Sequence, residues 1–263
     1  MKIRIEPLNI ELQHVRGFSI IELLVVMAIL LTVFSIVMSG ITVLVSRNSA
    51  ETAKLDINQE AREFMDQAVR DLHQAGWPNV KMYDPSVFAQ PVIKDMRVAV
   101  GLVKVSSNQI QFESDTDGGG RVQEVFIQLV ASGPGGTCPC TLQRGSVSKV
   151  DGVDPLSQPV PTEFTELNNV INSNGVYQIS GITASGALND TVYSAYKAAP
   201  VFSAFDKAGN AVALPIDINT AGPPAITDIK TINLTVNILS PSADLQTKVA
   251  PAISMTSDVR VND

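Results

Sequence analysis

The chain has 263 residues, a formal net charge of −7 and a sequence pI of about 4.9. An acidic chain gives no support to a general nucleic-acid interface, which needs a basic patch. The length leaves room for one sizeable soluble domain beyond a membrane anchor. Only His73 follows the first apolar segment, which argues against Ser-His-Asp or Cys-His chemistry. No catalytic residue and no cofactor is predicted, and the chain is not expected to be an enzyme.

Residues 1–17 precede the first apolar segment and are interpreted as a leader peptide that takes no part in the fold. They carry three basic residues, Lys2, Arg4 and Arg16, whereas the first acidic residue after the apolar segment is Glu51. Positive residues favour the cytoplasmic side of a membrane, so the N-terminus is expected inside and the bulk of the chain outside. The exported part would then lie in a compartment where disulfides persist.

Residues 23–46 contain no charged side chain. Roughly 20 apolar residues are enough to cross a bilayer as a helix, and a single span must be helical to satisfy its backbone. The sequence therefore predicts that residues 18–46 form the transmembrane half of a helix. Glu22 stands at the start of the apolar segment, where it could simply mark the membrane interface.

The hexapeptide 17–22 reads Gly-Phe-Ser-Ile-Ile-Glu. It resembles the prepilin processing motif of type IV pilins and type II secretion pseudopilins. The resemblance implies that a prepilin peptidase cuts between Gly17 and Phe18 and methylates the new amine of Phe18. It also implies that Glu22, the fifth mature residue, meets the N-terminus of a neighbouring subunit and sets the axial register. The likeness is complete over the motif and looser to about residue 74.

Residues 47–76 are expected to continue the helix as an amphipathic half. Apolar residues recur there at steps of three and four, which makes one stripe that another layer must cover. The stripe comprises Ala50, Ala53, Ile57, Ala61, Phe64, Ala68, Leu72 and Ala75. Arg62, Asp66 and Arg70 form a charged row that is interpreted as a solvated face. The tripeptide 76–78, Gly-Trp-Pro, should end the helix, with Trp77 capping the core.

Residues 77–263 are expected to form a globular β-rich domain, because short apolar alternations replace the helical period. Strands are predicted at 98–105, 109–112, 124–130, 201–205, 211–214, 232–238 and 253–261, and 150–186 is predicted to be a long loop. A long helix covering an antiparallel sheet is an α+β arrangement. It also resembles the pilin fold, and the domain is most similar to PilW-type minor pilins.

Asp115 and Asp117 lie in a Gly-rich hairpin loop and are weak candidates for calcium ligands. An EF-hand loop needs oxygen ligands at positions one, three and five and Glu at position twelve. Counted from Asp115, position five is Gly119 and position twelve is Phe126, so the pattern fails twice. A hairpin turn is the preferred interpretation, and no metal is predicted.

The two cysteines, Cys138 and Cys140, are separated by a single proline. Two thiolates are too few for a structural zinc site, which needs four ligands. A redox motif would have two residues between the cysteines. A tight disulfide and a pair of thiols both remain open, and the disulfide is preferred.

The resemblance implies a minor pilin of a type IV pilus, placed in its tip or priming complex. Its partners would be the prepilin peptidase, other pilin subunits through the N-terminal helix, and the inner-membrane assembly platform. The protein would begin as a single-pass inner-membrane protein with a periplasmic domain and end in the pilus at the cell surface. A type II secretion J-type pseudopilin is the close alternative. A singly anchored periplasmic binding protein or enzyme is the alternative from another class.

Overall fold

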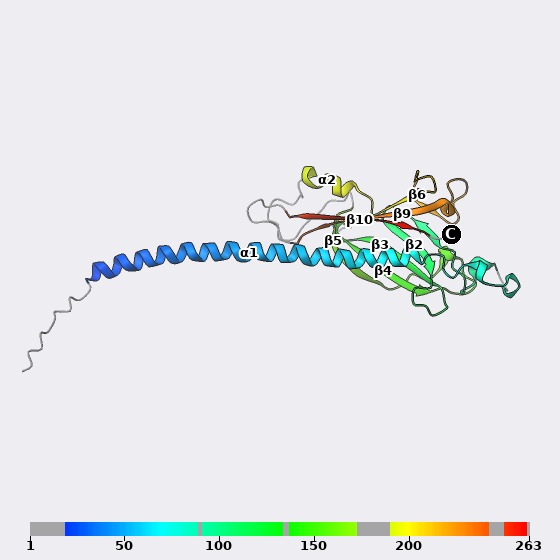
Figure 1. Cartoon of the computed structure of the whole chain (residues 1–263), viewed down its shortest axis with the longest axis horizontal. Coiled ribbons are helices and arrows are strands. Elements are labelled where there is room, and N and C mark those ends of the chain that lie inside the picture. The colour runs from blue at the N-terminus through cyan, green and yellow to red at the C-terminus, as the bar shows by residue number, and fades with distance from the viewer. Residues whose placement is uncertain (1–18, 89–90, 134–136, 173–189, 242–249, 262–263) are drawn as a thin grey trace, which may run out of the picture. The chain divides into compact units, whose positions relative to one another are not determined.

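The structure is a computed structural model that describes residues 19–88, 91–133, 137–172, 190–241 and 250–261 (Figure 1). The chain divides after Arg47 into two compact units. The first unit contains the N-terminal part of helix α1 (Ile20–His73), and the second contains the rest of α1 and a β-sheet. A long apolar helix followed by an antiparallel sheet confirms the predicted α+β layout.

Helix α1 spans 54 residues and confirms the prediction of one long helix within residues 18–76. It continues through Gly40 without a break. After the helix, Gly76 adopts a left-handed φ of 82°, and its N–H donates to the carbonyl of Glu113 at 2.9 Å. Glycine takes this conformation without steric cost, which explains why the helix stops where the sequence predicted.

The second half of α1 buries the predicted apolar stripe. Its side chains are buried from Ile57 onward, while those of Ala50 and Ala53 are half-buried. The charged row of Arg62, Asp66 and Arg70 is exposed, as expected. Most of the helical stability in this segment therefore comes from packing one face against the sheet.

Ten strands form one antiparallel sheet among the described residues. They are β1 (Leu102–Val105), β2 (Gln109–Ser114), β3 (Gln123–Gly133), β4 (Thr137–Ser148), β5 (Glu163–Val170), β6 (Phe202–Asp206), β7 (Ala211–Val212), β8 (Ile216–Asp217), β9 (Ile229–Leu239) and β10 (Ala252–Arg260). Their order is β7-β6-β9-β5-β4-β3-β2-β1-β8, and β10 also pairs with β9. Five short 3-10 helices and α2 (Asp190–Ala198) complete the described elements.

Several predicted strands are confirmed. The hairpin expected around residues 114–121 is formed by β2 and β3, with Glu113 opposite Glu124 in register. Strands β6 and β7 correspond to the strands predicted at 201–205 and 211–214, and they pair with each other. Strands β9 and β10 correspond to the last two predicted strands, and they pair from Ala252 opposite Leu239 to Arg260 opposite Thr231.

Other expectations were wrong. The stretch 150–186 was expected to be loop, but β5 lies within it, and its residues 173–186 lie outside the described part. Strand β1 begins only at Leu102, because residues 98–100 are irregular and Gly101 adopts a left-handed φ of 85°. Strand β4 and helix α2 were not predicted. Trp77 does not cap the core, since 54% of its surface is exposed.

The main core lies between the second half of α1 and the sheet. Its largest fully buried side chains include Leu72 from the helix, Phe112 from β2, Phe202 from β6 and Ile232 and Leu234 from β9. Burying a side chain of this size stabilises the fold by about 1.5–3 kcal/mol relative to leaving it exposed. The core therefore joins strands that are far apart in the sequence to a single helix face.

An ion pair also joins this helix segment to the sheet. Arg144 Nε on β4 donates to Asp71 Oδ2 on α1 at 2.6 Å, and the side chains are only 16% and 11% exposed. Burial raises the pKa of Asp71, while the hydrogen bond and charge of Arg144 act in the opposite direction. Arg144 thus offsets part of the cost of burying this carboxylate.

We expect Arg144→Met to lower the free energy of unfolding by about 2–4 kcal/mol, because it leaves Asp71 buried without its partner. The measurement is urea denaturation of the full chain in detergent micelles. Arg62→Met, at an exposed position of helix α1, is the matched control and should change stability by about 0.5 kcal/mol or less. Equal stability of the two variants would show that the ion pair contributes nothing.

Candidate functional site

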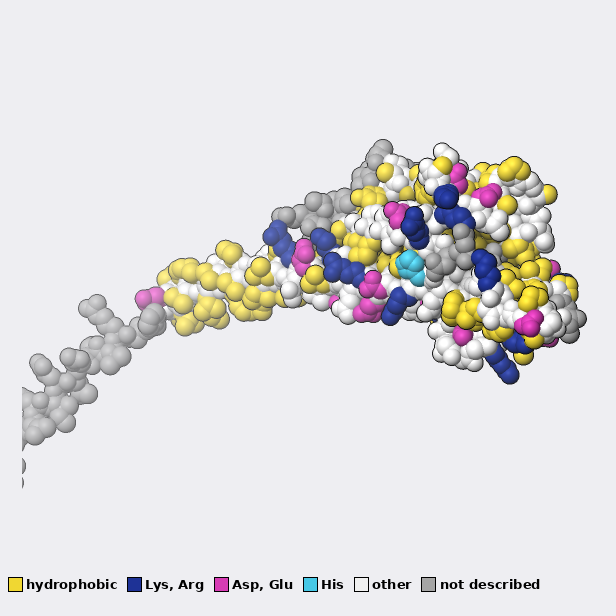
Figure 2. Space-filling view, turned by 45° about the vertical axis from the view of Figure 1, so that its right-hand side comes forward, with side chains coloured by type: hydrophobic (Ala, Val, Ile, Leu, Met, Phe, Trp, Pro, Cys, Tyr) yellow, Lys and Arg dark blue, Asp and Glu magenta, His cyan; other side chains and the backbone are white. Residues whose placement is uncertain are grey.

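The N-terminal part of α1 is the first candidate site. It is long and apolar enough to cross a membrane by length and composition. Its large apolar side chains are exposed, from Ile20 at 80% to Val45 at 63%. Figure 2 shows them as a nearly continuous hydrophobic surface along this part of the helix. Such a surface is stable only in lipid or against other apolar helices.

Polar side chains within this apolar segment are few, and both of its threonines bond to their own helix. Thr32 Oγ1 donates to the carbonyl of Ile29 at 2.7 Å, and Thr42 Oγ1 donates to the carbonyl of Met38 at 2.9 Å. Hydroxyls that bond to their own helix add little cost in an apolar phase. The segment therefore suits a lipid or helix-bundle environment along its length.

Glu22 is the exception to that pattern. It lies in the first turn of α1, is exposed, and is the single charged residue in 19–46. A carboxylate in the first turn interacts favourably with the helix dipole. Gly17 and Phe18, the predicted processing and methylation residues, lie outside the described residues.

The aspartates of the β2–β3 hairpin loop are engaged with donors of the same loop. Asp115 Oδ1 accepts from Gly119 N at 3.0 Å, and Asp115 Oδ2 accepts from Gly120 N at 2.9 Å. Asp117 Oδ2 accepts from Gln123 Nε2 at 2.6 Å. Among the described residues, no group of three or more His, Cys, Asp or Glu side chains could hold a metal ion. These contacts are those of a turn stabilised by its own side chains.

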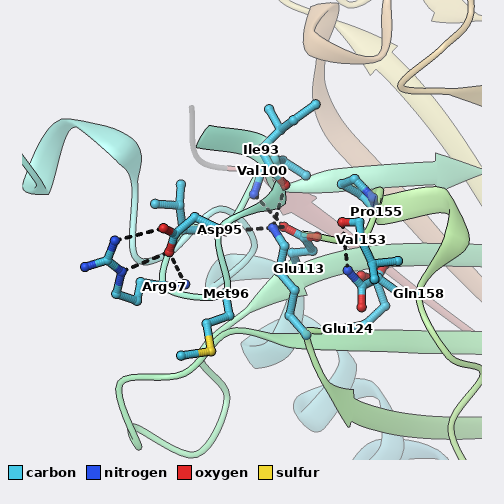
Figure 3. A network of polar contacts seen from close by, with 12 residues as sticks. Ile93, Asp95, Met96, Arg97, Val100, Glu113, Glu124, Val153, Pro155 and Gln158 are labelled. Atoms are coloured by element: carbon cyan, nitrogen blue, oxygen red, sulfur yellow. Dashed lines mark hydrogen bonds and ion pairs between the residues drawn. The ribbon is translucent and has the colours of Figure 1, made fainter. Parts of the chain in front are cut away.

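The second candidate site is a buried polar network that the sequence did not reveal (Figure 3). It combines Glu113 of β2, Glu124 of β3 and Lys149, which directly follows β4. Both carboxyl side chains are fully buried, and 4% of the lysine's surface is exposed. Ionisable groups are almost never buried in this way unless they are paired.

Lys149 is held by three oxygen atoms. Its Nζ donates to Glu113 Oε2 at 2.6 Å, to the carbonyl of Ile93 at 2.8 Å and to the carbonyl of Val98 at 2.9 Å. Glu113 Oε2 also accepts from the N–H of Val100 at 3.0 Å. The network therefore fixes the segment 93–100 onto the sheet.

Two carboxyl oxygens of this network lack a donor, which favours a proton on one of the two groups. Glu113 Oε1 and Glu124 Oε2 would have no donor if both groups were carboxylates. Burial, followed by the charge of Glu113, raises the pKa of Glu124 to about 8. A protonated Glu124 donates to Glu113, and its Oε1 accepts from Gln111 Nε2 at 2.8 Å. With Lys149 charged, the network is neutral.

The sequence held one signal for this network. Once the β2–β3 hairpin is placed in register, Glu113 stands directly opposite Glu124. Like charges in that position destabilise a sheet, so a compensating group is required. Lys149 could not have been identified as that group, because β4 was not predicted.

Cys140 is buried and disulfide-bonded. The side chain of Cys138, the other cysteine of the chain, lies outside the described part. A cavity of about 590 Å³ also opens beside β1, and its walls include Val98, Val100, Leu102 and Ile229. This volume lies within the range of small-molecule sites.

Comparison with known proteins gave no match to a family model, to a curated protein or to a solved structure.

Proposed function

We propose that the chain is a type IV pilin-like subunit, most similar to a minor pilin, which assembles through its N-terminal helix. The observation that carries the proposal is an uninterrupted helix with an apolar N-terminal part, a single carboxylate in its first turn and a Gly-Phe junction just before it. The β-rich domain would pack on the second half of this helix, as in the pilin fold. The mechanism is assembly, not catalysis.

Assembly would transfer the apolar surface of residues 20–45 from lipid to a bundle of similar helices. Lipid tails are as apolar as these side chains, so burial alone gives little preference for one position along the bundle. A charge pair does give such a preference. The new amine of Phe18 and the Glu22 carboxylate of a neighbouring subunit attract each other strongly where water is scarce. This pair would set the axial register.

Intact-mass analysis and N-terminal sequencing of the full chain from native membranes test the proposal. The host must have an active prepilin peptidase. We expect a chain that begins at Phe18 and carries one added methyl group. A chain that still begins at Met1 or Lys2 would overturn the proposal and favour a singly anchored periplasmic protein. The J-type pseudopilin alternative shares this processing, and gene neighbourhood separates a secretion system from a pilus.

A further inference from the structure

The buried network places an amine and a carboxyl group where they can react with each other. Lys149 Nζ lies 2.6 Å from Glu113 Oε2, and neither side chain is exposed. We propose that Lys149 and Glu113 condense to an intramolecular amide crosslink, with Glu124 transferring the protons. This would be a self-modification of the β-domain, independent of processing at the N-terminus.

Both reacting groups are held in place by the backbone. Two carbonyls, those of Ile93 and Val98, orient Nζ, and the N–H of Val100 orients Glu113 Oε2. Positioning of this kind replaces a bimolecular encounter by an intramolecular step, with effective molarities that reach roughly 10⁵–10⁸ M in well-oriented systems. An amide bond that would not form between free side chains in water is therefore accessible here.

Burial also favours the product over the reactants. A separate ammonium and carboxylate carry a large desolvation cost away from water, which their mutual attraction only partly offsets. The amide is neutral, and the water released can leave for bulk solvent. The medium that makes the ion pair costly therefore drives the condensation forward.

Glu124 supplies the proton transfers. The step begins when the Lys149 ammonium passes a proton to Glu113, which leaves a neutral amine and a carboxylic acid. Nζ then attacks Cδ of Glu113 as Glu124 protonates Glu113 Oε1, the oxygen that otherwise has no donor. A tetrahedral intermediate results, and the Nζ–Cδ bond is formed.

The collapse of that intermediate regenerates Glu124. The Glu124 carboxylate takes a proton from the nitrogen and gives it to one hydroxyl of the intermediate. The Cδ–O bond to that hydroxyl breaks and water leaves. The proton of the remaining hydroxyl returns to Glu124, so the products are one amide, one water and an unchanged carboxylic acid.

The position of the crosslink means that it would stabilise the fold. Glu113 and Lys149 are 36 positions apart, and they lie at the same end of the three neighbouring strands β2, β3 and β4. A covalent link there closes the loop formed by these strands in the unfolded chain as well as in the folded one. Closing such a loop restricts the unfolded state, as a disulfide does.

The test is the intact mass of the full-length protein, purified in detergent and measured after reduction. We expect a mass lower than the calculated one by one water, and a proteolytic fragment in which the peptides of Glu113 and Lys149 are joined. A full mass with two separate peptides would overturn the proposal. In that case the two residues form an ion pair only.

Two controls make the assignment specific. Glu124→Gln keeps the side-chain volume and a donor toward Glu113 but cannot shuttle protons, so it should fold and show the full mass. A water can also be lost by succinimide formation at Asp117-Gly118 or Asp151-Gly152, which mild base reverses, whereas the proposed amide survives mild base. A water loss that persists in Glu124→Gln, or that maps to Asp117 or Asp151, would therefore contradict the crosslink.

Discussion

Glu22→Ala should insert into the membrane normally but lose at least roughly tenfold in incorporation into the assembled filament or complex. Removing the carboxylate leaves the amine of Phe18 without its partner among apolar helices. Two unit charges 4 Å apart attract by about 4 kcal/mol at an effective dielectric constant of about 20. A loss of only 1.4 kcal/mol of that attraction already gives a tenfold effect.

The measurement compares two fractions of the same cells. Quantitative immunoblotting gives the amount of subunit in sheared or detergent-extracted assemblies and the amount in the inner membrane. Glu22→Gln preserves the shape of the side chain and removes only its charge, so it should behave as Glu22→Ala does. The matched control is Glu51→Ala, an exposed position of the same helix beyond the apolar segment. Glu51→Ala should assemble as the wild type.

The result distinguishes a role of Glu22 in the axial register of the subunits from a role in membrane insertion. If Glu22→Ala assembles at wild-type efficiency, then Glu22 is an interfacial residue and the charge pair with Phe18 has no role. If Glu22→Ala fails to reach the membrane, the defect lies in insertion, and the assembly role proposed for the carboxylate is contradicted. Only retained insertion with lost incorporation supports the proposed function.

The sequence predicted the parts of the fold whose residues repeat with a regular period. The stripe from Ile57 to Ala75 was visible because a helix that buries one face needs apolar residues at steps of three and four. Strand β9 was visible because Asn233, Thr235 and Asn237 alternate with apolar residues. In both elements the spacing of the apolar residues in the sequence matches the side of the element that is buried in the fold.

Strands β4 and β5 escaped prediction because their environment comes from distant segments. Strand β4 contains Pro139 and Gly145, residues that are depleted in strands. An added Cβ at Gly145 would lie 2.9 Å from both Pro161 Cγ and the carbonyl oxygen of Thr162. Glycine is therefore needed for the close approach of the chain just before β5. A requirement of this kind appears only when both segments are in place.

The buried network escaped prediction for a related reason. The predicted strand at 109–112 gave no sign that both faces of β2 are covered, yet Gln111 and Glu113 are buried. The segments 93–100 and 149–158 cover that face through Lys149, and Gln111 Nε2 reaches the carbonyl of Pro155 at 3.3 Å. The second layer over this face consists of segments without regular secondary structure. Such segments show no periodic pattern of apolar residues, so the sequence could not predict them. The hexapeptide 17–22, in contrast, is contiguous, so its resemblance to a processing motif could be recognised from the sequence alone.

The free energy of unfolding should fall as the pH rises from about 4.5 to about 8, and then level off. The pKa of Glu124 is about 8 in the folded protein against a usual value of 4.5, because burial disfavours its charged form. Between these values the unfolded chain has lost the proton that the folded chain keeps, so rising pH favours unfolding. Since each pKa unit corresponds to about 1.4 kcal/mol, we expect a total loss of about 3–5 kcal/mol.

Urea denaturation of the full chain in a nonionic detergent, at several pH values from 5 to 9, measures this slope. Glu124→Gln has no proton to lose and should show a much flatter profile, while the exposed Glu60→Gln should keep the wild-type slope. Burial also raises the pKa values of Asp71 and Glu113, so the contribution of Glu124 is the difference between the slopes of the wild type and of Glu124→Gln. Asp95 does not add to the slope, because its hydrogen bond from Arg97 lowers its pKa. Burial raises the pKa of Glu124 whether or not Glu113 is joined to Lys149. The pH dependence of stability therefore tests the protonation of Glu124, and the intact mass separately tests the crosslink. Equal slopes in wild type and Glu124→Gln would show that Glu124 is ionised in the folded protein. That result would contradict the inference that Glu124 is protonated beside Glu113.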